Sequence, residues 1–170
     1  MAIHALTGTP GTGKTSISKN LNKEIIHLSD LYPNSSEGRN QNGEWIIDLD
    51  ILNKLTQEKL KDDTIIEGHL SHFIDNIDQI IVLRCDPREL RKRMEMRDYN
   101  IEKIEENLEA EAIGLIYSQA LEINNGIDVF QHDTTKLSVD ESTTILRDFF
   151  EGNIKLDETI DYSERIMEWY

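Results

Sequence analysis

The chain has 170 residues, of which 38% are hydrophobic, enough for one α/β domain with a buried core and too few for two. Its 33 acidic and 18 basic side chains leave a net charge of −15, which argues against sequence-independent binding to a nucleic-acid backbone. The charge fits either a basic protein partner or simply an acidic, soluble surface. Because no apolar run reaches the about 18 residues that span a bilayer and no signal-peptide pattern is present, we expect a cytoplasmic protein without membrane contacts.

The first predicted strand, residues 3–6, leads into the most informative motif. Residues 8–15 read Gly-Thr-Pro-Gly-Thr-Gly-Lys-Thr and fit the pattern GxxxxGK[ST], and a helix-compatible stretch follows over 16–21. In such a loop, backbone N–H groups converge on phosphate oxygens, Lys14 reaches the outer phosphates and Thr15 holds a magnesium ion. A glycine-rich turn that binds no phosphate is the alternative, but it would not require Lys-Thr at its end. The motif therefore predicts a nucleoside triphosphate site.

The rest of the chain alternates between short strands and helical stretches. Further strands are predicted at residues 24–28, 64–66, 79–83 and 127–131. This βαβ alternation predicts a parallel sheet. Between the second strand and a helix that begins near Asp48 or Asp50, residues 33–44 are polar and rich in turn formers. We expect a mobile surface excursion there, which serves either as a linker or as a flap over the substrate.

Two candidate site residues follow the third predicted strand. Glu67 stands at its carboxyl end, where a carboxylate beside a phosphate loop is suited to bind magnesium through water. His69 and His72 follow at a spacing compatible with a metal pair, but without further ligands nearby a polar loop pair is favoured. His69 is also placed to orient an attacking water or accept its proton.

A locally basic segment covers residues 84–97. It contains six of the eighteen cations: Arg84, Arg88, Arg91, Lys92, Arg93 and Arg97. Asp86 as a cap and Pro87 in the first turn predict a helix that starts there. These cations either pair with nearby glutamates or neutralise charge on a transferred phosphate, and we expect some of them to face phosphate. Cys85, which ends an apolar run, is predicted to be a buried, reduced thiol.

Four segments together resemble one family. GTPGTGKT, EGHLSH, IVLRCDP and RDYNIEKIEENLEAE are similar to the adenylate kinase isoenzyme 6 family in its archaeal form, over residues 1 to about 150. The most distinctive part is an R-x-Y-x-x-x-K-x-x-x-N-x-x-x-E run. Its members here are Arg97, Tyr99, Lys103, Asn107 and Glu111.

The resemblance implies a three-layer P-loop nucleoside triphosphate hydrolase fold of the nucleoside monophosphate kinase type, with a five-stranded parallel sheet flanked by helices. One domain would cover 1–170, with a monophosphate-binding flap at about 28–50, a short lid at about 97–107 and a C-terminal helical tail at about 151–170. Positions that contact ATP in the family correspond to Gly11, Gly13, Lys14, Thr15, Ser16, Arg97 and Lys136.

The resemblance also implies an activity. Family members transfer the terminal phosphate of ATP to AMP or a related monophosphate, hydrolyse ATP, and bind a basic small-subunit ribosomal protein during late rRNA maturation. Lys14, Arg97, Glu67 and His69 would be the catalytic residues, with Mg²⁺ on Thr15 and, through water, on Glu67. The acceptor would lie near Asp30, Arg39 or Asp50. The alternative is an ATP-hydrolysing ribosome-assembly factor that remodels a ribosomal protein complex and has little kinase activity.

Two residues depart from the family pattern. Many relatives carry Asp-x-His where this chain has Glu67-Gly68-His69, and the longer carboxylate weakens the transfer of its role. Asp98 stands where the best-known relatives have a glycine, which adopts hinge angles more readily. In the tail, residues 164–170 have apolar groups at helical spacing, which favours a helix docked on the parent core over an interface with another chain.

Overall fold

The computed structural model describes residues 2–123, 126–156 and 159–169, and five parallel strands form its centre. The strands are β1 (His4–Gly8), β2 (Glu24–His27), β5 (Thr64–Glu67), β6 (Gln79–Arg84) and β7 (Asp128–Asp133), in the spatial order β2-β5-β1-β6-β7. Each begins within one residue of its predicted start. The predicted five-stranded parallel sheet is therefore confirmed.

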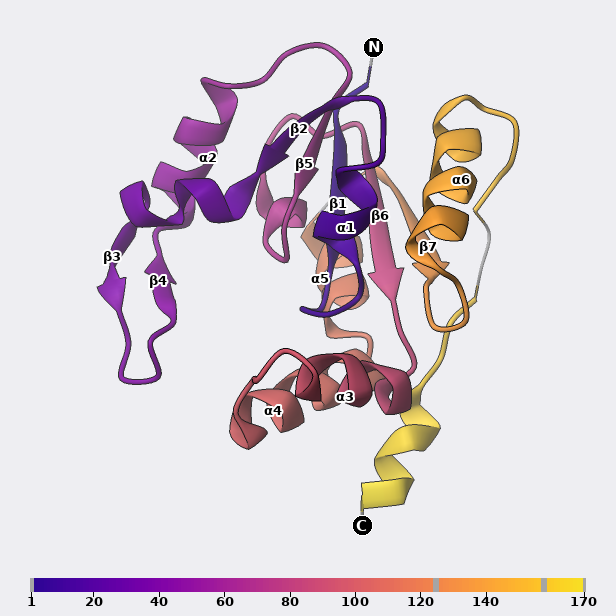
Figure 1. Cartoon of the computed structure of the whole chain (residues 1–170). Helices are drawn as coiled ribbons and strands as arrows, with labels where there is room; N and C mark the ends of the chain where they lie inside the picture. The colour runs from indigo at the N-terminus through magenta and orange to yellow at the C-terminus, as the bar shows by residue number, and fades with distance from the viewer. Residues whose placement is uncertain (1, 124–125, 157–158, 170) are drawn as a thin grey trace.

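Helices cover both faces of this sheet, which explains why its central strands β1, β5 and β6 are almost wholly buried. Alternate strand residues such as Ile65 and Ile66 belong to opposite core clusters. One face packs against α1 (Lys14–Ser18) and α6 (Val139–Phe150), and the other against α2 (Leu49–Gln57) and α5 (Leu115–Ile123). Figure 1 shows α1 in front of the sheet and α5 behind it. The layers are those of the predicted three-layer fold.

The segment between β2 and α2 is more regular than predicted. After a 3₁₀ helix, η1 (Leu28–Asn34), strands β3 (Ser36–Arg39) and β4 (Trp45–Ile47) form an antiparallel hairpin that stands apart from the main sheet in Figure 1. The Asn40 carboxamide oxygen closes its turn by accepting hydrogen bonds from the backbone of Asn42 and Glu44. The predicted surface excursion is thus built on a hairpin whose two strands were not predicted, because polar turn residues mask them.

Two helices and the tail lie at the carboxyl ends of the strands. α3 (Pro87–Glu95) begins at the predicted cap, where the Asp86 carboxylate accepts a hydrogen bond from the Arg88 backbone. α4 (Ile101–Ala112) packs beside it around a separate apolar cluster. The 3₁₀ helix η3 (Ser163–Trp169) docks on this cluster through Trp169.

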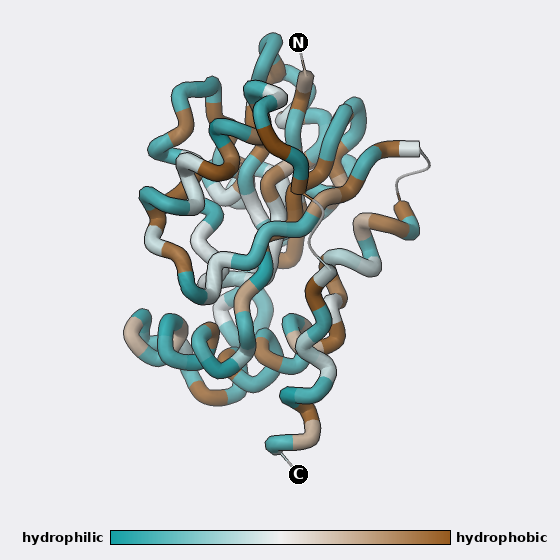
Figure 2. The backbone as a smooth tube through the Cα atoms, turned by 90° about the vertical axis from the view of Figure 1, so that its right-hand side faces the viewer, coloured by the Kyte–Doolittle hydropathy of each residue, from teal (hydrophilic) through white to brown (hydrophobic). Residues whose placement is uncertain are grey.

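Docking of the tail on its own chain was the favoured prediction, although the observed helix is 3₁₀ and Tyr170 lies outside the described residues. Figure 2 shows the apolar residues concentrated along the central strands and the C-terminal segment running down to the helices below them. Within the described residues, none of the helices is long and apolar enough to cross a membrane.

Candidate active site

The phosphate loop curls between β1 and α1 at the carboxyl edge of the sheet. Gly11 and Gly13 have φ angles of 93° and 107°, left-handed values that few other residues adopt without strain. At Gly8 a Cβ atom would lie 2.6 Å from the Leu83 carbonyl oxygen, so the loop packs directly on β6. The glycines of the motif therefore have a backbone reason as well as the expected ligand-binding one.

Lys14 begins α1 and folds back into the loop. Its Nζ donates hydrogen bonds of 2.7 Å and 3.1 Å to the carbonyl oxygens of Gly8 and Thr9, and the residue is only 8% exposed. Burial lowers the pKa of Lys14 to about 8, against the opposing effect of the Glu67 and Glu111 carboxylates. The ammonium group is thus held inside the loop, still mainly charged at neutral pH.

Oxygen ligands meet at the other end of the loop. The Thr15 hydroxyl donates a 3.3 Å hydrogen bond to Glu67 Oε1 at the end of β5, and Glu67 Oε2 lies 2.7 Å from His27 Nδ1 at the end of β2. A hydroxyl and a carboxylate suit Mg²⁺, which prefers oxygen ligands and retains waters. No cluster of three His, Cys, Asp or Glu side chains among the described residues forms a complete metal site. Waters and bound phosphate oxygens would supply the remaining ligands.

His27 was missed by the sequence analysis. The only sequence signal for His27 is its place near the carboxyl end of the second predicted strand. It lies beside Glu67 because β2 and β5 are neighbouring parallel strands whose carboxyl ends meet at the same edge of the sheet. The strand order that makes them neighbours is a property of the fold, and the sequence alone does not provide it.

His69 lies between the phosphate loop and a larger cleft. Its Nδ1 is 3.3 Å from the Tyr32 hydroxyl. Burial, followed by the positive charges of Lys14, His72 and Lys103, lowers the pKa of His69 to about 4. The ring is therefore neutral at pH 7 and able to accept a hydrogen bond, but the same environment makes it a weak base.

His72 does not pair with His69. It is buried, with its Nδ1 2.9 Å from the Thr7 hydroxyl and its Nε2 3.1 Å from the Gln119 side chain. The favoured non-metal interpretation is retained, but His72 is a buried structural residue and not part of a polar loop.

Only one member of the basic segment lines the phosphate-loop cavity. That residue is Arg97, which follows α3. Three others do not line that cavity: Arg88 pairs with Glu168, Arg91 pairs with Glu105, and Arg93 donates to the carbonyl oxygens of Thr134 and, at 3.4 Å, of Gly11 in the phosphate loop. The local density of cations thus mostly reflects pairing, the alternative interpretation of this segment.

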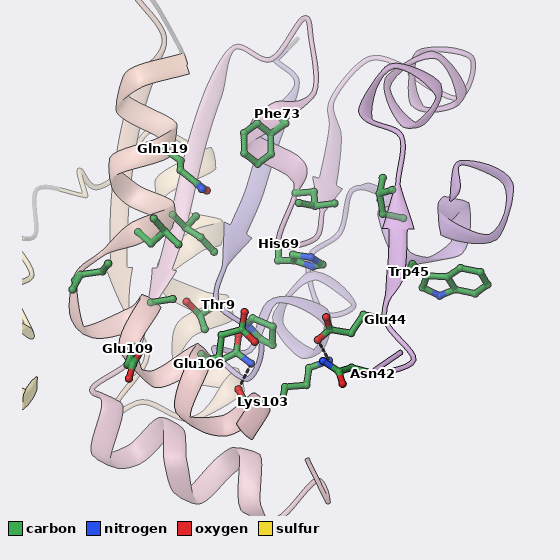
Figure 3. Close-up of a pocket in the computed structure, with 18 of the residues that line it drawn as sticks. Thr9, Asn42, Glu44, Trp45, His69, Phe73, Lys103, Glu106, Glu109 and Gln119 are labelled. Atoms are coloured by element: carbon green, nitrogen blue, oxygen red, sulfur yellow. Dashed lines mark hydrogen bonds and ion pairs between the residues drawn. The ribbon is translucent and has the colours of Figure 1, made fainter. Parts of the chain in front are cut away.

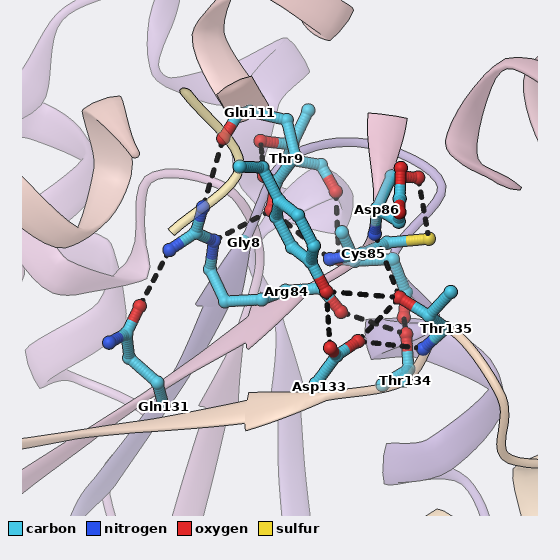
Figure 4. A network of polar contacts seen from close by, with 12 residues as sticks. Gly8, Thr9, Arg84, Cys85, Asp86, Glu111, Gln131, Asp133, Thr134 and Thr135 are labelled. Carbon is cyan, nitrogen blue, oxygen red and sulfur yellow. Dashed lines mark hydrogen bonds and ion pairs between the residues drawn. The ribbon is translucent and has the colours of Figure 1, made fainter. Parts of the chain in front are cut away.

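Arg84 is not on the helix surface at all. It ends β6, is 2% exposed, and donates through Nε to Glu111 Oε1 at 2.7 Å and through Nη1 to Gln131 Oε1 at 2.6 Å. Glu111 also accepts a 2.6 Å hydrogen bond from the Thr9 hydroxyl and a 3.1 Å bond from the Cys85 backbone (Figure 4). This network ties α4 to the phosphate loop.

Cys85 is buried as predicted, and burial raises the pKa of its thiol to about 12.

Two cavities meet at this edge of the sheet. The smaller, of about 290 Å³, is lined by the loop residues Gly11, Gly13, Lys14, Thr15 and Ser16 together with Glu67 and Arg97. The larger, of about 920 Å³, opens between the β3–β4 hairpin and α4 (Figure 3). Four residues line both: Pro10, Tyr32, His69 and Lys103. The two cavities therefore adjoin each other.

The remaining predicted positions fall differently. Arg39 lines the larger cleft and stacks its guanidinium 4.1 Å from the Trp45 ring centroid. Asp30 borders a separate groove beside β2, and Asp50 lines neither half of the site. Lys136 is exposed in the turn after β7 and does not line either cavity. The structure thus brings together the phosphate loop, Glu67, His69 and Arg97, but not Lys136.

Comparison with known proteins gives the family. Residues 5–114 match the family described as AAA domain. A protein of Methanosarcina acetivorans named "Putative adenylate kinase" is 35% identical over 96% of this chain and 95% of its own length. One of the same name from Halobacterium salinarum is 32% identical over 95% and 98%. The chain belongs to the family of these archaeal adenylate kinases.

Solved structures agree with this family's P-loop kinase fold. A shikimate kinase from Bacteroides thetaiotaomicron is 17% identical and superposes with a TM-score of 0.51 over 88% of this chain and 98% of its own. The YorR protein of Bacillus subtilis, solved with phosphorylated GDP, is 21% identical with a TM-score of 0.57 over 88% and 95%. At these identities the likeness concerns the fold alone.

Asp98, beside Arg97, has a φ of 56°, in the left-handed region where glycine is favoured. We expect Asp98→Val to lower the free energy of unfolding by about 1–2 kcal/mol, because a β-branched residue is strained there. Asp98→Asn is the matched control and should stay within about 0.5 kcal/mol of wild type, since asparagine tolerates this conformation. Urea denaturation measures both, and equal effects of the two variants would contradict the backbone explanation.

Proposed function

We propose that this protein transfers the terminal phosphate of ATP to AMP or a related nucleoside monophosphate. The observation that carries the proposal is the shared wall between the two cavities. A phosphate-loop cavity that shares four lining residues with a larger cleft would accommodate a donor and an acceptor with their phosphates facing each other. The names of the archaeal relatives support the same reaction.

In this proposal the phosphate loop holds the donor. Backbone N–H groups around Gly11 and Gly13, with the Lys14 ammonium, bind the β- and γ-phosphates, and Arg97 covers them. An oxygen of the acceptor phosphate forms a new bond to the γ-phosphorus. The bond from the γ-phosphorus to the β–γ bridging oxygen breaks, and ADP leaves with that electron pair. Ser16 at the start of α1 would complete the donor contacts, and Lys136 would join them only if its turn moves.

Magnesium fits this site through Thr15 and, by way of water, through Glu67, and when bound it neutralises phosphate charge. The short contact from His27 orients the Glu67 carboxylate. We further propose that the hairpin segment within residues 28–50 acts as the flap over the acceptor and that residues 97–107 act as the lid over the donor. One domain over 1–170 would then carry the whole reaction.

The test is to incubate the protein with ATP and Mg²⁺, with and without AMP, and to quantify ADP and inorganic phosphate. Transfer yields two ADP for each ATP consumed, only when AMP is present, and no inorganic phosphate. Release of inorganic phosphate without AMP, with only one ADP formed for each ATP consumed, would contradict transfer as the main reaction.

Two features favour ATP hydrolysis as a second function, coupled to small-ribosomal-subunit maturation. His69 is neutral at the junction of the cavities, where its ring is able to accept a hydrogen bond from an attacking water and so orient it. The net charge of −15 is compatible with a basic partner such as a small-subunit ribosomal protein, which would be remodelled during the ATP cycle. Phosphate release that rises when such a protein is added supports this role, and release that stays unchanged contradicts it.

A further inference from the structure

Three polar residues of α4 recur at four-residue spacing and so share one face of the helix: Lys103, Asn107 and Glu111. Glu111, at the C-terminal end, is hydrogen-bonded to Thr9 of the phosphate loop and paired with Arg84. Asn107 donates a 2.8 Å hydrogen bond to the Lys103 carbonyl oxygen. Since α4 is anchored to the phosphate loop at Glu111, the residue two turns earlier on the same face has a defined place relative to that loop.

That side chain is Lys103, which lines both cavities. Its Nζ lies 3.5 Å from Glu44 Oε1 on the β3–β4 hairpin and 5.3 Å from the Tyr99 ring centroid. Figure 3 shows Lys103 and Glu44 meeting from opposite sides of the cleft. Lys14 and Arg97 line only the phosphate-loop cavity. Among the described lysines and arginines, Lys103 is the one that lines both cavities.

The ion pair with Glu44 is weak enough to exchange. Both side chains are partly exposed, 33% for Lys103 and 41% for Glu44, and such pairs contribute about 0–1 kcal/mol. A phosphate carries more charge than one carboxylate and forms stronger charge-assisted hydrogen bonds. An acceptor phosphate that enters the cleft would therefore displace Glu44 from the ammonium group.

We propose that Lys103 contacts the transferred phosphoryl group from the acceptor side, and that Glu44 holds its ammonium group in place until the monophosphate binds. The proposal rests on the transfer reaction proposed above. Lys103 would neutralise charge on the phosphoryl oxygens as the bond to the acceptor forms and the bond to ADP breaks. Lys14 and Arg97 would act from the donor side.

The first test is Lys103→Met, with Lys92→Met as the matched control on the exposed surface of α3. We expect Lys103→Met to lower kcat for ADP formation from ATP and AMP about 100-fold, with the KM for ATP within about twofold of wild type. Lys92→Met should match wild type. Thermal unfolding of each variant establishes that it is folded. A kcat for Lys103→Met within twofold of wild type overturns the proposal.

Glu44→Gln supplies a second, independent readout. It should lower the KM for AMP about threefold in the wild-type background, because the acceptor no longer competes with a carboxylate for the ammonium group. In the Lys103→Met background the same change should have no effect. An equal effect in both backgrounds overturns the role of Glu44. If the wild-type protein makes no ADP from ATP and AMP, the proposed function is wrong. If the wild-type protein transfers phosphate and Lys103→Met does so equally well, only the role of Lys103 is wrong.

Discussion

Lys14→Met should lower kcat for phosphate transfer by about 10²–10³-fold, a loss of roughly 3–4 kcal/mol of transition-state stabilisation. The Lys14 ammonium is already held within the loop by the Gly8 and Thr9 carbonyl oxygens, so it needs little reorganisation to reach a phosphate. Methionine preserves the length and apolar stem of the side chain but removes the charge and its hydrogen bonds. Steady-state kinetics at saturating ATP and AMP, together with phosphate release without AMP, measure the effect.

The matched control is again Lys92→Met, which removes a lysine from an exposed helix face and should leave kcat unchanged. Circular dichroism and thermal unfolding show whether Lys14→Met retains its fold. A folded Lys14→Met protein with wild-type turnover of both reactions would mean that the phosphate-loop interpretation of residues 8–15 is wrong.

The second large effect is expected at the buried pair between Arg84 and Glu111. Arg84→Met should lower the free energy of unfolding by about 3–5 kcal/mol, because Glu111 is then left as an unpaired buried charge. That is a large share of the about 5–15 kcal/mol by which domains are stable. Urea denaturation measures the change.

The double variant Arg84→Met/Glu111→Leu separates charge burial from packing. It should regain at least half of the stability lost by Arg84→Met, because neither charge remains buried alone. Arg88→Met is the control, since Arg88 and Glu168 form an exposed pair whose loss should cost under about 1 kcal/mol. A double variant no more stable than Arg84→Met would show that the pair is not the source of the loss.

Local patterns were sufficient for the regular elements of the main sheet. Each of the five strands contains at least two adjacent apolar residues within a short segment, and the caps Asp48 and Asp86 mark helix starts, so both signals lie within a few neighbouring residues. The β3–β4 hairpin was missed because its strands are only three to four residues long and β3 has no apolar residue. Its order depends on Trp45 and Ile47 packing against the core, which is a tertiary contact.

The basic segment shows the same limit for charged residues. Arg84, Arg88 and Arg97 are close in sequence, yet one is buried, one pairs with the tail and one lines the phosphate-loop cavity. Sequence spacing places them on adjacent elements but does not say where each side chain points. His27 was missed for a related reason, because it reaches Glu67 only through the pairing of β2 with β5.

The parallel α/β fold, the phosphate loop and the resemblance to the adenylate kinase family could all be predicted from the amino-acid sequence, since each depends on residues that are adjacent or regularly spaced. Only the folded structure shows which cation lines the loop cavity, which residues surround Glu67, and that a second cleft lies beside the loop. Those properties arise from contacts between segments as distant as Thr9 and Glu111 or Glu44 and Lys103. Strand order and helix packing bring such segments together, and no local pattern encodes the resulting distances.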